Sequence, residues 1–202
     1  MVMDIISWIS VGLILITATT ILINRDWRVG LGALAVQYLA ASWLVTRHLP
    51  FAMGSAKLIT GWMVVAVLGI TRLGLTNLEH KEDTFLPRGQ GFTAILMGIV
   101  VLITMGSTLS IEAAIPGLGL PVIGGGILLI GAGVVHLGVT SDPWRVTIGL
   151  LTLLAGFEIL YGAVESSILV TGFLALVNLG LGIIGSYLLM AGSSPLEMEQ
   201  DR

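Results

Sequence analysis

The sequence has no cysteine and very little charge. Because Cys is missing from all 202 residues, the chain cannot ligate an iron–sulfur cluster through thiolates, form a disulfide or attach a c-type haem. Charged residues make up 10% of the chain, whereas soluble domains carry about 25%. The net charge of −3 gives no indication of nucleic-acid binding. The chain therefore holds no thiolate-bound cofactor, and its scarcity of charge is not that of a soluble domain.

Apolar residues dominate instead, at 55% of the chain with a mean hydropathy of +1.01. They form runs of about 18–25 residues, long enough to cross a bilayer as helices. The pattern predicts an all-α, polytopic membrane protein of about seven transmembrane helices, the first of them retained because no basic segment precedes it. The predicted helices lie near Ile5–Ile23, Val29–Thr46, Phe51–Thr71, Gly91–Leu109, Val122–Val139, Val146–Val164 and Ser167–Ala191.

Basic residues between these helices fall almost entirely on one side of the membrane. That side receives Arg25, Arg28, Arg72, Lys81, Arg88, Arg145 and Arg202. The opposite side receives Arg47. Loops rich in Lys and Arg stay in the cytoplasm, so we expect the N-terminus outside and the tail of residues 192–202 in the cytoplasm.

A short motif occurs twice, as Asp26-Trp27-Arg28-Val29 and as Pro143-Trp144-Arg145-Val146. Each copy is followed by polar residues inside apolar helices: Gln37 and Lys57 in the first, Glu158 and Asn178 in the second. The spacing from tryptophan to the first polar residue differs between the copies. The pattern predicts two parallel three-helix repeats joined by a linking helix. The expected units are residues 1–72, residues 73–120 with a polar loop and the linking helix, and residues 121–191.

Glu158 is the most informative single residue. It lies seven residues before Glu165 and thirteen after Arg145, which at about 1.5 Å per residue places it inside the hydrocarbon core. An ionised carboxylate there costs at least about 2.5–3.5 kcal/mol. We therefore expect Glu158 to be neutral, paired or in contact with water, which indicates handling of protons or ions. The alternative is a structural, protonated carboxyl bonded to a neighbouring helix.

Three more intramembrane polar residues could complete such a path. Lys57 could extend its amine to the outer interface, or it could be buried with a carboxylate or water as partner. Gln37 and Asn178 are neutral, and such residues favour hydrogen bonds between helices, worth roughly 0.6–2 kcal/mol each.

Other polar groups give weaker signals. Glu112 is expected in an outer loop, Glu165 at the interface, and His136 in packing contacts. The acidic cluster of residues 79–83 lacks the spacing of a metal site and is expected to be a solvated loop. The glycines of residues 117–126 follow no strand and precede no GKS or GKT, so they are not a phosphate loop. We expect no catalytic residue, no bound metal and no cofactor in this chain.

The stretch Ile127–Met190 resembles the K subunit of respiratory complex I and the C subunit of Mrp-type sodium/proton antiporters. The second helix of the K subunit carries a glutamate in a pattern like GLELMINA, which is similar to the segment Ala155–Ala163 around Glu158. The whole chain resembles the E component of hydrogenase-4. The K subunit usually has a second glutamate on its third helix, where this chain has Asn178.

The resemblance implies a non-catalytic subunit in the membrane arm of a redox-driven proton or sodium pump of the bacterial or archaeal inner membrane. Its partners would be antiporter-like and other membrane-arm subunits, with the redox chemistry in other chains. Glu158 would take the role of the K-type glutamate, and Lys57 or a neighbouring carboxylate would replace the missing second one. Two alternatives remain: a self-contained small transporter or channel, and a purely structural membrane subunit.

Overall fold

A computed structural model describes residues 2–24, 26–75 and 90–192 of the protein. Within these ranges all regular structure is helical, and the helices are α1 Val2–Ile23, α2 Trp27–Val45, α3 Phe51–Gly74, α4 Gln90–Ala114, α5 Leu120–Val139, α6 Pro143–Val164 and α7 Ile168–Ala191. All seven are long and apolar enough to span a membrane. The prediction of an all-α, multi-pass membrane protein with seven transmembrane helices is confirmed.

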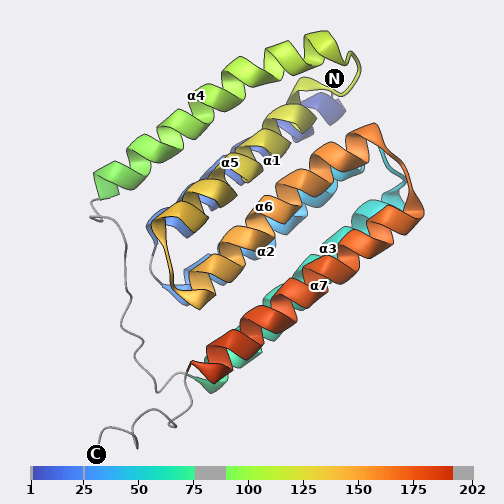
Figure 1. Ribbon diagram of the computed structural model, residues 1–202. Helices are drawn as coiled ribbons and strands as arrows, with labels where there is room; N and C mark the ends of the chain where they lie inside the picture. Colours follow the sequence, from blue (N-terminus) through green and yellow to red (C-terminus); the bar gives the residue numbers. More distant parts are fainter. Residues whose placement is uncertain (1, 25, 76–89, 193–202) are drawn as a thin grey trace, which may run out of the picture.

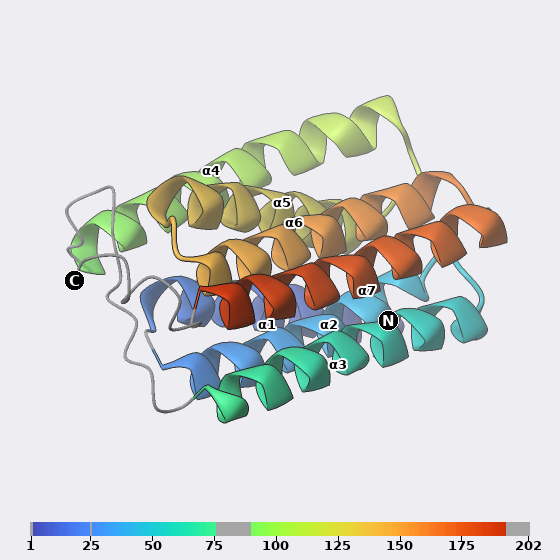
Figure 2. The same ribbon diagram turned by 60° about the horizontal axis from the view of Figure 1, so that its bottom comes forward.

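Six of the helices form two rows of three that pack face to face (Figure 1). One row is α1, α2 and α3, and the other is α5, α6 and α7. Within each row successive helices are neighbours, and across the rows α1 packs on α5, α2 on α6, and α3 on α7. The second view shows the same layering (Figure 2). Helices that face each other are four apart in chain order, so they run in the same direction.

Glycines set how closely the helices of the second row approach. A Cβ added at Gly156 of α6 would lie 2.6 Å from the carbonyl oxygen of Gly126 in α5. A Cβ at Gly133 of α5 would lie 2.7 Å from Cβ of Leu153 in α6. Small residues at such positions let two membrane helices pack backbone to backbone. The apolar core lies between the rows, where Ile14, Leu34, Leu129 and Ile159 are completely buried.

The duplicated motif begins the middle helix of each row. Asp26 precedes α2 and accepts a hydrogen bond from the backbone N–H of Arg28, and Asp142 precedes α6 and accepts one from the N–H of Arg145. Both aspartates are therefore N-caps, which satisfy free N–H groups at a helix start. The parallel order of the two rows is what the predicted parallel repeat requires, while the repeat itself stays a prediction.

Helix α4 links the two rows and lies at the edge of the bundle, packed against α5 and α1 (Figure 1). The polar loop expected at Arg72–Gln90 starts later than predicted, because α3 continues to Gly74. Most of this loop, the acidic cluster of residues 79–83 and the tail of residues 193–202 lie outside the described residues.

The prediction for Glu112 was wrong. It is not in a loop but in the last turns of α4, which continues to Ala114 beyond the expected end. Its carboxylate accepts hydrogen bonds from the backbone N–H groups of Gly117 at 3.2 Å and Gly119 at 2.9 Å. Both glycines have positive φ, 100° and 82°, a conformation that side chains with a Cβ rarely adopt. Glu112 therefore ties the α4–α5 turn to the end of α4.

Candidate functional site

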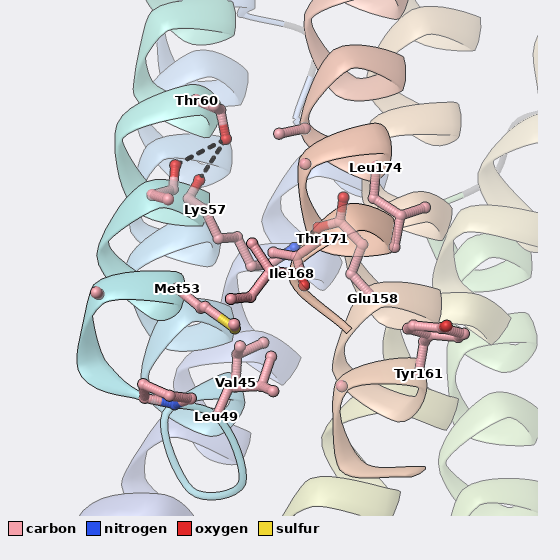
Figure 3. Close-up of a pocket in the computed structure, with 16 residues that line it drawn as sticks. Val45, Leu49, Met53, Lys57, Thr60, Glu158, Tyr161, Ile168, Thr171 and Leu174 are labelled. Atoms are coloured by element: carbon pink, nitrogen blue, oxygen red, sulfur yellow. Dashed lines mark hydrogen bonds and ion pairs between the residues drawn. The ribbon is translucent and has the colours of Figure 1, made fainter. Parts of the chain in front are cut away.

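Lys57 of α3 and Glu158 of α6 form an ion pair inside the bundle. The Nζ atom of Lys57 contacts Oε2 of Glu158, and both side chains are 6% exposed. The residues come from different rows and are 101 positions apart in the chain. Figure 3 shows the lysine side chain reaching from α3 toward the carboxylate. Of the two expectations for Lys57, the structure shows the buried amine with a carboxylate partner.

The two residues meet because they lie at the same depth. Lys57 is six residues after the start of α3 at Phe51, and Glu158 is six residues before the end of α6 at Val164. At about 1.5 Å per residue, each lies about 9 Å from its helix end. These two ends lie on the same side of the bundle, because α3 and α6 run in opposite directions. Neither charged group reaches a helix end, so the charge of each residue is compensated by the other.

A cavity of about 430 Å³ adjoins the ion pair (Figure 3). It lies among the end of α2, the first half of α3, the end of α6 and the first half of α7. Most of its lining is apolar, for example Val45, Leu49, Met53 and Leu174. The volume is in the range of small-molecule pockets in proteins, about 300–1,000 Å³. The ion pair is therefore not sealed in packed side chains but borders open space.

Tyr38 and Asn178 form a second polar contact beside the pair. The hydroxyl of Tyr38 in α2 donates a 2.8 Å hydrogen bond to Oδ1 of Asn178 in α7. The Nζ atom of Lys57 lies 6.0 Å from the centroid of the Tyr38 ring, at the limit of a cation–π contact. A Cβ at Gly61 of α3 would lie 2.4 Å from that ring, so glycine at this position leaves the room that Tyr38 occupies.

Gln37 makes a third contact, on the neighbouring face of α2. Its Nε2 atom donates a 3.2 Å hydrogen bond to Oγ1 of Thr152 in α6. The other amide atom, Oε1, is buried without a hydrogen-bond partner among the described residues. Unpaired buried acceptors are costly in protein interiors. Gln37 therefore links α2 to α6 and has one amide oxygen left to accept a further hydrogen bond.

The four residues singled out from the sequence are all buried and all make contacts between helices. Lys57 and Glu158 are directly paired, Asn178 joins them through Tyr38, and Gln37 lies one residue from Tyr38 on α2. Sequence reasoning missed Tyr38 and Thr152. Tyr38 could have been noticed, because a buried tyrosine hydroxyl in a membrane needs a partner. Threonine is too common in membrane helices for Thr152 to be distinctive.

The remaining polar groups lie apart from this cluster. His136, near the end of α5, is 3% exposed, and Glu165 is exposed just after α6. Arg145, near the start of α6, is buried and donates a 2.8 Å hydrogen bond to the backbone carbonyl of Asn24. Among the described residues, no group of three His, Asp or Glu side chains could hold a metal ion.

Comparison with known proteins does not identify a relative. No family model matches the chain, and no curated protein or solved structure matches it significantly.

Proposed function

We propose that this chain is a non-catalytic membrane-arm subunit of a complex I-like or group 4 hydrogenase-like redox-driven ion pump. In this proposal the Lys57–Glu158 pair is one step of a proton or sodium path. The observation that carries the proposal is the pair itself, two charges with 6% exposed side chains within a membrane-spanning bundle. Ionisable residues in such positions are costly and usually serve transport or proton transfer.

Energetics argue against a merely structural pair. The desolvation of two ions can exceed their attraction, and replacing a buried pair by apolar residues is often neutral or stabilising. Helix contacts in this protein are already supplied by glycine packing and by the Tyr38–Asn178 hydrogen bond. A pair that is not needed for packing needs another reason to exist, and proton transfer is the one that its chemistry offers.

The chemistry that the ion pair offers is the transfer of one proton between Lys57 and Glu158. In the pair, Lys57 and Glu158 are either an ammonium and a carboxylate or an amine and a carboxylic acid, which differ by one proton transfer between two atoms in contact. A change of charge in a neighbouring subunit would favour one form over the other. The pair could then accept a proton on one side and release it on the other.

Other buried polar groups extend from the pair toward the opposite end of the bundle. Thr152 lies about 9 Å nearer the start of α6 than Glu158 does. Ser186 is buried near the end of α7 and lies still closer to that side of the bundle. Ser186 Oγ and Gln37 Oε1 have no hydrogen-bond partner among the described residues. Such atoms are available for water molecules, which occupy polar interior sites and commonly satisfy them.

The proposal includes an orientation and partners. Loops rich in Lys and Arg favour a cytoplasmic C-terminus, and with this orientation the ion pair would lie in the outer half of the proposed bacterial or archaeal inner membrane. Large apolar side chains such as Ile70, Leu102, Leu169 and Leu176 are exposed on α3, α4 and α7. These surfaces suit contact with lipid and with antiporter-like subunits of a larger complex.

The decisive experiment begins with affinity purification of the tagged chain from its native host in mild detergent. Co-purification of several large membrane subunits and a redox subunit is expected. The purified complex is then reconstituted, and proton translocation is compared with redox turnover. Glu158→Gln and the paired variant Lys57→Met/Glu158→Met should lower translocation per turnover sharply. An assembled double variant that pumps normally would leave the chain as a structural subunit.

The cavity beside the ion pair favours a second candidate, a self-contained transporter. An open space of about 430 Å³ that reaches two charged groups is what a substrate site in such a protein requires. This candidate predicts that the chain purifies alone as a stable species and moves ions across liposomes without partners. The membrane-arm proposal predicts neither result.

A further inference from the structure

Part of the cavity wall lies on the outer surface of the bundle. Its lining includes Ala52 and Ala56 of α3 and Gly172 of α7, which are exposed on the surface of the bundle. All three are small residues within membrane-spanning segments. Gly172 leaves open space around it, with no atom within 4 Å of an added Cβ. A molecule dissolved in the bilayer can therefore reach the part of the cavity wall that these residues form on the surface of α3 and α7.

The lining selects an apolar molecule over water. Val45, Leu49, Met53 and Leu174 line the cavity, and apolar cavities stay dry or bind apolar ligands. At its inner end the cavity meets Lys57 and Glu158. An ammonium group has three N–H donors, and a carboxylate has two acceptor oxygens. One Lys57–Glu158 contact leaves donors and one carboxylate oxygen for a further hydrogen bond.

The charge of the pair determines the charge of the occupant. Lys57 and Glu158 together carry no net charge, so a ligand with a charged head group would bring an uncompensated ion into a low-dielectric site. A neutral hydroxyl, carbonyl or amide can instead accept from the ammonium or donate to the free carboxylate oxygen. The favoured ligand thus combines an apolar body with one neutral polar end.

We infer that this cavity is a binding site for a neutral amphiphile that enters from the bilayer and hydrogen-bonds to the Lys57–Glu158 pair. The site would lie about 9 Å below the helix ends, within reach of a lipid-dissolved alcohol or amide. Binding is a property of the cavity and does not depend on proton transfer. A bound amphiphile would also separate the ion pair from the cavity and the bilayer beside it. It would therefore slow any proton exchange of the pair through the cavity.

Thiol labelling of the full-length chain in native membrane vesicles tests this inference. The sequence has no cysteine, so Gly172→Cys creates a unique thiol at the mouth of the cavity. Gly180→Cys is the matched control, since it lies on the same helix, also has open space for a Cβ, and does not line the cavity. The vesicles are treated with N-ethylmaleimide, and the tagged chain is then isolated. The labelled fraction at each reaction time gives the labelling rate.

The protecting molecules are decane, n-decanol, decanoate and decylammonium, compared at equal concentration in the membrane. n-Decanol should slow labelling of Gly172→Cys severalfold, more than decane and more than either charged analogue, and should leave Gly180→Cys unchanged. In a Lys57→Met/Glu158→Met background the advantage of n-decanol over decane should disappear. This readout needs no pumping activity, so its failure is distinguishable from failure of the proposed function.

Three results would overturn the inference. Equal protection by the neutral and charged analogues would show that the pair does not select the head group. Equal slowing of Gly172→Cys and Gly180→Cys would be a general effect on the bilayer. Equal labelling rates of Gly172→Cys with and without n-decanol would show that no amphiphile enters the cavity.

Discussion

The ion pair makes a quantitative prediction about stability. Glu158→Gln leaves the Lys57 ammonium without its counter-charge in a position where the side chain is 6% exposed. Breaking a buried ion pair by removing one partner costs about 3–5 kcal/mol. Because about 1.4 kcal/mol is a factor of ten, the folding equilibrium should shift by roughly two to three and a half powers of ten. Lys57→Met leaves the carboxyl without its partner and should cost a similar amount, and either single cost is lowered to the extent that the remaining group becomes neutral.

The double variant Lys57→Met/Glu158→Met removes both charges together. It should be far more stable than Lys57→Met or Glu158→Met alone, and it should match the unmodified protein or exceed it by about 1–4 kcal/mol. The assay is resistance of the tagged chain to proteolysis in native membrane vesicles as the temperature is raised. A double variant whose loss equals the sum of the two single losses would refute direct pairing, because independent sites are additive.

Three further outcomes follow from the fold. Reporter fusions in the loop of residues 72–90 and in the C-terminal tail should both report cytoplasm, and opposite locations would contradict the proposed topology. Gly61→Ala should destabilise by about 1–3 kcal/mol because its Cβ would lie 2.4 Å from the Tyr38 ring, whereas Gly98→Ala, with open space, should be tolerated by thermal proteolysis. Asp142→Ala should cost about 1 kcal/mol through loss of the helix cap, a prediction that an unchanged proteolysis midpoint would contradict.

The helices could be predicted from the sequence because the bilayer imposes a simple rule. Backbone groups in hydrocarbon must be bonded within the helix, so apolar length alone indicates a span. Apolar length does not predict where a helix ends, because local contacts determine its last residues. The segment around Glu112, expected to be a loop, is helical to Ala114 because Glu112 can bond the glycine turn that follows. That contact depends on the positive φ of Gly117 and Gly119, which apolar length does not indicate.

The residues of the candidate site could be predicted from the sequence, but the contacts between them could not. A charged residue such as Glu158 is conspicuous within an apolar run, and so is Lys57. Their pairing depends on α3 lying beside the row that holds α6, which is a long-range property of the fold. Tyr38 escaped notice because aromatic residues are ordinary in membrane helices. Its role becomes visible only in the structure, where its hydroxyl bonds Asn178 and its ring lies near the Lys57 ammonium.

Helix α4 packs against few neighbours, and its main effect is on the direction in which the second row of helices crosses the membrane. It borders α5 and α1 at the edge of the bundle, and much of its surface is exposed. Each row crosses the membrane three times, so two rows joined directly would run in opposite directions. One additional crossing restores the direction, and Glu158 then meets Lys57 at equal depth. In a chain without α4 the second row would be inverted, and the carboxylate would lie near the opposite face of the membrane from the amine. The linking helix at the edge of the bundle thus sets the condition under which the two charges can meet.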